Sequence, residues 1–453
     1  MTTFFAAQRF PPPQFTETKH QLPVMTEPAV RSLGLERLDI AVLVAVLALA
    51  AWLALRQRSR RGIVGLGIFS VLYFGFWRKG CICSIGSIQN IAQGLADSSY
   101  AVPVAALAFG LLPLVVALLC GRVFCSSVCP HGALQDLVLL KPVKVTEWLE
   151  HGLRLLAHVY LGLAVVFAAT GGGYIICQYD PFISIFRLSG SALTVGLGIG
   201  LLVLGVFVGR PYCRFLCPYG VLLGLASCVS KWRVRITPDQ CTQCRLCEQS
   251  CPVNAINKST VDSPAPAHAI ATDKRRLATF ILLLPVLVGV GLWFGGFAGT
   301  NFARKHRVVN LAERVHLEET GAVKDTTDAS AAFRATGEPL EKLFADADVV
   351  RSRYVLAGRW CGAWVGLVIG LKLISLAIRR RRTDYEADQF RCVACARCFR
   401  YCPEELKRLG LPVPETGFGA GLQTAPRVAT GELRSDGSAR SGDRRTTGVP
   451  RPS

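Results

Sequence analysis

The chain has 453 residues, of which 51% are hydrophobic and 18% are charged, and its formal net charge is +20. The apolar content excludes a disordered chain, and the length excludes a small disulfide scaffold. The positive charge first suggests a nucleic-acid binder, but the apolar residues come in long uninterrupted runs with Lys and Arg concentrated between them. This pattern indicates a basic membrane protein in contact with lipid, and no nucleic-acid partner is expected.

A polar segment, residues 1–38, precedes seven apolar stretches. The stretches lie at about 39–56, 62–77, 101–120, 155–176, 190–208, 277–298 and 361–378. A helix of about 20 residues is about 30 Å long, which is enough to cross the hydrocarbon core of a bilayer. We therefore predict a mainly α fold, a polytopic membrane helix bundle with about seven transmembrane helices.

The basic residues between the stretches predict the orientation. Four groups of Lys and Arg, within 56–61, 141–144, 231–276 and 379–382, fall on one side of the membrane if the N-terminus lies on the other. Cytoplasmic loops are enriched in Lys and Arg. We therefore expect a multi-pass protein of the bacterial plasma (inner) membrane with an extracytoplasmic N-terminal segment.

The remaining boundaries follow from these spans. We expect a membrane domain with an internal repeat (39–235), a first cluster motif (236–260), a transmembrane helix (277–298), an extracytoplasmic segment (299–358), a last transmembrane helix (361–378), a second cluster motif (385–409) and a tail (410–453). The two cluster motifs fall on the cytoplasmic side. The tail is rich in Gly, Ser, Arg and Thr, a composition typical of disorder.

Two segments carry cysteines in the spacing C-x2-C-x2-C-x3-C-P, which is the bacterial ferredoxin run. The eight residues are Cys241, Cys244, Cys247 and Cys251 in the first run, and Cys392, Cys395, Cys398 and Cys402 in the second. Zinc is the alternative, but a zinc site favours two CxxC pairs at a longer separation. Each run therefore predicts the ligands of a [4Fe–4S] cluster, two clusters in all.

The two runs lie 151 residues apart (392 − 241) with two predicted spans between them, which return the second run to the side of the first. In two-cluster ferredoxins the fourth cysteine of each run ligates the other cluster. We therefore expect one small cytoplasmic ferredoxin domain of the bacterial two-[4Fe–4S] type, with Cys251 and Cys402 exchanged between the runs. Two separate single-cluster modules are the alternative.

A Gly-Arg-x2-Cys-x3-Cys-Pro-x-Gly motif occurs twice, at 121–132 and 209–220, with an offset of 88 residues (213 − 125). Cysteines spaced i, i+4 share one helix face, and the proline would then interrupt the helix. Four thiols are therefore candidates for one further metal centre: Cys125, Cys129, Cys213 and Cys217. The alternative is a packing motif with inert buried thiols.

Four other cysteines fall near the outer membrane surface in the predicted topology: Cys81, Cys83, Cys177 and Cys361. They are candidates for a further thiolate-ligated metal centre, and a disulfide or plain packing is the alternative in an oxidising compartment.

Three residues, His151, Arg154 and His158, share one helix face and are candidates for contact with a quinone headgroup. The alternative is an ordinary interfacial face with snorkelling side chains. No acid–base or nucleophile constellation occurs along the chain, so any chemistry belongs to bound cofactors.

The paired motifs at 121–132 and 209–220, followed by the ferredoxin run at 241–252, resemble the membrane polyferredoxins of the NapH/NosR/CcoG type. That family includes the quinol-oxidising partner of periplasmic nitrate reductase, the accessory protein of nitrous oxide reductase and an assembly protein of the cbb3 oxidase. The resemblance implies a membrane electron carrier, with the eight ferredoxin cysteines as ligands and the C-x3-C-P cysteines as redox-relevant groups.

Together these observations predict an iron–sulfur protein that passes single electrons between a quinol or cytoplasmic donor and an extracytoplasmic redox partner, such as a subunit of a respiratory complex. We expect such a protein to be an electron-transfer subunit of an oxidoreductase complex rather than a stand-alone enzyme. Two alternatives are a maturation factor, which would reduce a metal or thiol for a partner respiratory enzyme, and a redox sensor.

Overall fold

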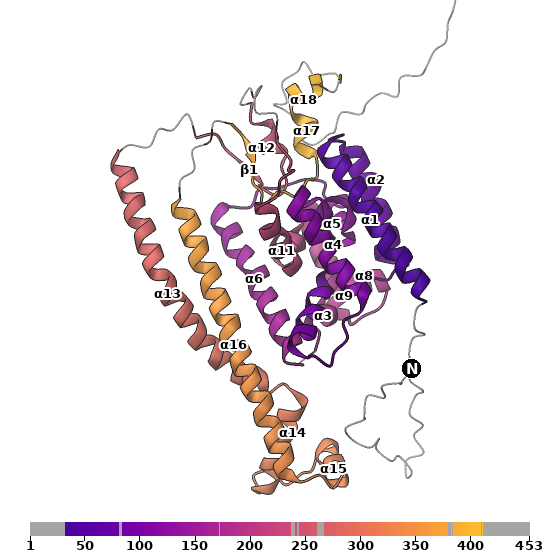
Figure 1. Ribbon diagram of the computed structural model, residues 1–453, viewed down its shortest axis with the longest axis vertical. Helices are drawn as coiled ribbons and strands as arrows, with labels where there is room; N and C mark the ends of the chain where they lie inside the picture. The colour runs from indigo at the N-terminus through magenta and orange to yellow at the C-terminus, as the bar shows by residue number, and fades with distance from the viewer. Residues whose placement is uncertain are drawn as a thin grey trace, which may run out of the picture. The chain divides into compact units, whose positions relative to one another are not determined.

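The computed structural model describes residues 32–80, 84–171, 173–236, 241, 244–260, 267–378, 382, 384–408 and 410. The described chain is mainly helical, as expected (Figure 1). Four helices are long and apolar enough to cross a membrane: α1 (Leu33–Leu55), α6 (Glu147–Ala169), α13 (Ala267–Ala303) and α16 (Leu340–Ala377). A fifth span results if α8 (Pro181–Arg187) and α9 (Ala192–Phe207), which are bent by 101°, count as one.

The other predicted spans fall in shorter helices. The stretch at 62–77 forms α2 (Arg60–Ser70) and the π-helical turn η1 (Val71–Trp77), the stretch at 101–120 forms α4 (Val104–Cys120), and the stretch at 190–208 forms α9. The number of seven spans therefore stays a prediction.

Short elements connect these helices, and many of the cysteines lie in them or directly beside them. They are α3 (Ser84–Ala96), η2 (Phe124–Val128), α5 (Pro130–Leu137), α7 (Ile175–Tyr179), α10 (Pro211–Phe215), α11 (Pro218–Cys228), α12 (Leu246–Ser250), β1 (Ile256–Asn257), α14 (Arg307–Glu319), α15 (Asp328–Ala335), β2 (Glu386–Ala387), α17 (Arg397–Tyr401) and α18 (Pro403–Arg408). The main hydrophobic core joins α1, α2, α4, η2, α6 and α11 with residues of both cluster motifs.

Local signals explain why α6 begins and ends earlier than the predicted span at 155–176. Acidic Glu147 and Glu150 occupy its first turn, where their negative charges interact favourably with the positive end of the helix dipole. The helix ends at Ala169, and Gly171 follows with a φ of +73°, the left-handed conformation in which glycine commonly ends helices.

Backbone contact joins α13 and α16, which lie side by side and antiparallel in Figure 1. Glycines recur at every fourth position along the contact: Gly291, Gly295 and Gly299 in α13, and Gly358, Gly362 and Gly366 in α16. A Cβ atom at Gly299 would lie 2.6 Å from the carbonyl oxygen of Tyr354, and one at Gly362 would overlap the carbonyl group of Gly291. Small residues of this kind let membrane helices approach to backbone contact.

Helix α16 begins 21 residues before the predicted span at 361–378, because its first turns belong to a second hydrophobic core. There Leu343 and Ala347 pack against Val315 of α14 and Phe333 of α15. A helix of 38 residues is about 57 Å long, which exceeds the hydrocarbon thickness by a wide margin. Helices α14 and α15 therefore form a helical cap at one end of the α13–α16 pair.

The cluster motifs lie at the opposite end of that pair. Strand β1 precedes α13 and strand β2 follows α16, and the two strands pair antiparallel, with Ile256 opposite Ala387 and Asn257 opposite Glu386. This short ladder places the two ferredoxin runs beside each other (Figure 1).

Candidate iron–sulfur sites

The two ferredoxin runs form one module. Helix α12 of the first run packs against α17 of the second, and the backbone amide of Asp388 donates to the carbonyl oxygen of Ala255 at 2.7 Å, next to the β1–β2 ladder. The hairpin of α13 and α16 is thus inserted into a single cysteine-rich unit.

The loops of the two runs share an uncommon backbone conformation. Arg245 and Ala396, which occupy equivalent positions before the third cysteine of each run, have φ angles of +62° and +57°. Positive φ is sparsely populated by residues other than glycine, so its recurrence shows that both loops follow the same path. Cys251 and Cys402 both end a short helix in an extended conformation, which separates each from the three cysteines before it.

The thiols sort into two groups by mutual electrostatic influence. Cys241, Cys244 and Cys402 all act on Cys247, whereas Cys392, Cys395 and Cys251 act most strongly on Cys398. Each group therefore takes three thiols from one run and the fourth from the other. Burial raises the pKa of Cys247 and of Cys392 to about 12, and a bound metal would oppose this effect by stabilising the thiolates.

The donor chemistry of these groups fits an iron–sulfur cluster, because each offers four thiols and Cys-only ligation is characteristic of [4Fe–4S] sites. Among the described residues, no three His, Cys, Asp or Glu side chains converge on one point in the manner of ligands to a single ion. A cubane spreads its thiolates around four iron atoms, so its ligands need not converge on one point.

The C-x3-C-P cysteines form a third group of thiols. Cys125 lies in the turn η2 and Cys213 in α10, while Cys129 and Cys217 directly precede α5 and α11. The expectation that each pair shares one helix face is wrong, because the helix ends before the second cysteine and the proline begins the next helix, where its fixed φ is favourable.

These four thiols are electrostatic neighbours across the internal repeat. Cys213, Cys125 and Cys217 all act electrostatically on the buried thiol of Cys129. Burial raises the pKa of Cys213 to about 12, and the neighbouring Cys125 adds to the effect. That the four thiols form one metal centre stays a prediction.

The arginine of each repeat reaches toward the other copy. Arg210 donates to the carbonyl oxygens of Cys125 and Ser126, the latter at 3.1 Å. Arg122 donates to the carbonyl oxygen of Phe390 at 2.7 Å, and its Nη2 lies 3.8 Å from Cys125 Sγ and 3.2 Å from the position that a Cβ atom at Gly220 would occupy. The repeated Gly-Arg pair thus interlocks the two copies.

A buried carboxylate links the thiol groups to the first helices. Asp136 forms ion pairs with Arg60 at 2.5 Å and with Arg210 and Arg397 at 3.4 Å each. Burial alone would raise the pKa of Asp136, but the three arginines together hold it below its ordinary value. Arg58 pairs with the fully buried Glu405 at 2.6 Å, so the basic loop after α1 holds the second ferredoxin run.

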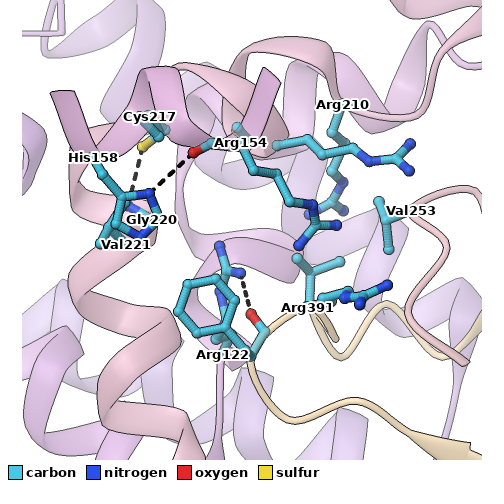
Figure 2. Close-up of a pocket in the computed structure, with 14 residues that line it drawn as sticks. Arg122, Arg154, His158, Arg210, Cys217, Gly220, Val221, Val253 and Arg391 are labelled. Carbon is cyan, nitrogen blue, oxygen red and sulfur yellow. Dashed lines mark hydrogen bonds between the residues drawn. The ribbon is translucent and has the colours of Figure 1, made fainter. Parts of the chain in front are cut away.

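A small pocket lies between the C-x3-C-P cysteines and the ferredoxin module (Figure 2). Five arginines line it: Arg122, Arg154, Arg210, Arg214 and Arg391. Glu150 neutralises two of them, because its carboxylate lies 2.5 Å from Arg154 and 2.6 Å from Arg214. His158 also lines the pocket and lies parallel to the ring of Phe390 with centroids 6.4 Å apart.

Of the predicted quinone face, Arg154 and His158 line this pocket, and His151 is not among the lining residues. The imidazole Nδ1 of His158 lies 3.0 Å from the carbonyl oxygen of Arg154, so part of its bonding capacity is used within α6.

The outer cysteines are only partly described. Cys361 packs against Gly162 of α6, and Cys177 against Gly86 of α3, so the two described thiols contact different helices. Cys81 and Cys83 lie outside the described residues. A metal centre at this set of cysteines stays a prediction.

Sequence reasoning missed the charged residues around the sites. Asp136, Glu150 and Arg214 have no recognisable motif, and their roles depend on contacts between distant segments. Only the repetition of Gly-Arg before each C-x3-C-P motif was a usable signal for Arg122 and Arg210.

Comparisons with known proteins agree with this geometry. A family described as a 4Fe-4S binding domain matches residues 102–147 and 192–237, one match for each C-x3-C-P copy. A second family, also described as a 4Fe-4S binding domain, matches residues 234–257, which hold the first ferredoxin run. No solved structure matches the chain.

Several curated proteins are similar to this chain. It is 30% identical over 192 residues to an uncharacterized protein of Methanocaldococcus jannaschii, covering 40% of this chain and 77% of that protein. It is 27% identical to the putative electron transport protein YccM of Escherichia coli K12, over 44% of this chain and 65% of YccM. It is 26% identical to the ferredoxin-type protein NapH of the same organism, over 49% of this chain and 82% of NapH.

The chain therefore combines helices apolar enough to span a membrane, matches to 4Fe-4S binding domains and relatives named as ferredoxin-type and electron transport proteins. It belongs to the NapH/NosR-type family of membrane polyferredoxins, which are iron–sulfur electron-transport proteins.

Proposed function

We propose that this membrane protein carries single electrons through two [4Fe–4S] clusters held in the ferredoxin module. Cys241, Cys244, Cys247 and Cys402 hold one cluster, and Cys392, Cys395, Cys398 and Cys251 hold the other. The observation that carries the proposal is the sorting of the eight thiols into these two groups, each completed by the fourth cysteine of the other run.

The clusters supply one-electron chemistry, and the chain supplies their surroundings. Cys247 is 7% exposed, and Cys392 and Cys398 pack against the main core, so these three ligands are partly shielded from water, whereas Cys244 is exposed. Arg60 donates to the carbonyl oxygen of Cys395 at 3.2 Å, which holds the second loop in place.

The C-x3-C-P thiols extend the proposal to a third centre. Cys125, Cys129, Cys213 and Cys217 are mutual neighbours, and Arg122 contacts both Cys125 and the segment that leads to Cys392. This adjacency supports a route from the module into the membrane domain. The same contact makes the cluster that is completed by Cys251 the one nearer to the third centre.

The arginine-lined pocket is the site that best suits a quinone headgroup. It adjoins Cys213, Cys217 and the loop before Cys392, and it offers Arg154 and His158 as polar groups beside the apolar Val221 and Val253. The proposed direction is between a quinol or cytoplasmic donor and an extracytoplasmic redox partner of a respiratory system. The ferredoxin module lies on the cytoplasmic side in this proposal, because the basic loop after α1 contacts it.

Counting iron and acid-labile sulfide in anaerobically purified protein tests this function, together with EPR spectra of the reduced form. We expect about twelve irons, because three cubanes hold four each. Cys251→Ala should lose the cluster of the second run, and Cys402→Ala that of the first. Cys228→Ser is the matched control, because Cys228 is exposed and belongs to none of the three groups.

Iron-free protein would refute the proposal. Retention of the second-run cluster in Cys251→Ala would refute the shared ligation and favour two separate modules. A count near eight irons would leave the two ferredoxin clusters and remove the third centre.

A further inference from the structure

The charge of Arg122 is balanced differently from that of the other arginines around the pocket. Arg210, its counterpart in the repeat, pairs with Asp136, and Arg154 and Arg214 pair with Glu150. Arg122 is 7% exposed, yet within the described part of the chain it forms no ion pair with a carboxylate. A buried guanidinium without a counter-charge is strongly disfavoured.

The donors of Arg122 point to the group that balances it. Nη1 bonds to the carbonyl oxygen of Phe390, Nη2 faces Cys125 Sγ, and Nε has no partner among the described residues. The guanidinium also lies close enough to act on Cys213 and Cys217. Three of the four C-x3-C-P thiols are therefore within its electrostatic reach.

The fit around this guanidinium is close. Nη2 lies beside Gly220, where a side chain would displace it, and the equivalent Gly132 of the other copy faces Arg210. A Cβ atom at Gly132 would lie 2.7 Å from the carbonyl oxygen of Cys125, so the glycine that closes the motif faces a close neighbour in both copies. Arg122 thus occupies a defined position between the four thiols and the second ferredoxin run.

We propose that Arg122 is the counter-charge of the third centre and sets its reduction potential. This inference rests on the proposed function, because it requires that Cys125, Cys129, Cys213 and Cys217 ligate a cluster as thiolates. Arg122 is a positioning residue: it contacts the proposed ligand Cys125 and, through the carbonyl oxygen of Phe390, the segment that precedes Cys392.

The sign of the effect follows from charge. A centre ligated by four thiolates becomes more negative when it accepts an electron, so a neighbouring cation stabilises the reduced form and raises the reduction potential. The electron comes from the adjacent cluster of the module, which is oxidised by one unit as the third centre is reduced. No bond forms or breaks in this step.

A redox titration monitored by EPR on the full-length protein, purified anaerobically, tests this inference. We expect Arg122→Gln to keep its irons. The equilibrium between the oxidised and reduced forms of the third centre should shift at least tenfold toward the oxidised form, which lowers the reduction potential by about 59 mV or more for a one-electron couple. Arg122→Lys keeps the charge and should retain most of the wild-type potential. Arg78→Gln is the matched control, because Arg78 is also largely buried, pairs with Asp39 at 2.8 Å and does not line the pocket.

An unchanged potential in Arg122→Gln with full iron content would overturn the inference and leave the proposed function intact. A shift of equal size in Arg78→Gln would overturn it as well, because the effect would then be general to buried arginines. If Arg122→Gln loses iron, the test passes to Arg122→Lys, which keeps the positive charge. A reduction potential lower than wild type by about 59 mV or more, a tenfold shift of the redox equilibrium, would contradict the role of charge. A wild-type count of eight irons would remove the third centre and this inference with it.

Discussion

A single methyl group at Gly362 should weaken the contact between α13 and α16. A Cβ atom there would lie 2.8 Å from the carbonyl carbon of Gly291 and 3.0 Å from Gly295 Cα, and it would overlap the Gly291 oxygen. All of these are backbone atoms, so no side chain can rotate away and the two helices must separate.

The size of the effect follows from two opposing terms. Overpacking of a close contact costs about 1–3 kcal/mol, and contact with backbone favours the upper end of that range. Alanine offsets part of this loss, because it is favoured over glycine in a helix by about 1 kcal/mol. We therefore expect Gly362→Ala to lower the free energy of unfolding by up to about 2 kcal/mol.

The assay is reversible unfolding in mixed micelles, followed by helical circular dichroism. Gly289→Ala in α13 is the matched control, because nothing lies within 4 Å of a Cβ atom at that position. It should be neutral or slightly stabilising. The reasoning is refuted if Gly362→Ala is as stable as Gly289→Ala.

Three further predictions concern the buried charges and the clusters. Removing one partner of a buried ion pair typically costs about 3–5 kcal/mol. Asp136→Asn leaves Arg210 without its carboxylate and should cost no more than the lower end of this range, because Arg60 and Arg397 are partly exposed. Asp348→Asn, in an exposed pair with Arg351, is its control in the same unfolding assay. The pKa of Asp136 is lowered on folding, so its contribution is present above pH 4 and should disappear as the pH falls through the folded value; stability that is flat with acidification would contradict this. Asp39→Asn removes the buried partner of Arg78 at 2.8 Å and should loosen α1 from η1, measured as faster proteolysis between them, and unchanged cleavage would count against it. Removal of iron with a chelator should expose residues 384–408 to protease, because metal binding and folding are coupled; equal protection with and without iron would rule this out.

The thiol groups were predictable because ligand spacing is a local property. The C-x2-C-x2-C-x3-C-P runs name all eight cysteines, and the two intervening helices predict that the runs meet. The strands that join them, β1 and β2, have two residues each, which is too short for any periodicity to indicate.

The charged partners were not predictable, because they connect segments far apart in the sequence. The Arg58–Glu405 pair spans 347 positions, and the Arg122–Phe390 hydrogen bond spans 268. The basic loop after α1 was interpreted only as a topology signal, and its contacts with the ferredoxin module emerge from the fold. The glycine spacing of α13 and α16 is visible in the sequence but has meaning only when the two helices are paired.

The predicted ends of the membrane helices also differ from the structure. Hydropathy locates the membrane-embedded part of a helix, whereas the helix itself continues until a cap or a break occurs. Helix α16 begins at Leu340 because its first turns have their own core with α14 and α15.

The pairing of β1 with β2 also constrains the order of events while the chain is synthesised and inserted into the membrane. Ile256 leaves the ribosome 130 residues (386 − 256) before the first residue of its partner strand. At about 5–20 residues per second, the earlier half of the module waits roughly 6–26 s. During that interval α13 and α16 must also enter the bilayer, so a chain whose hairpin inserts wrongly never brings its halves together. If the two runs share their clusters as proposed, only molecules that have already passed this insertion step can be loaded with both.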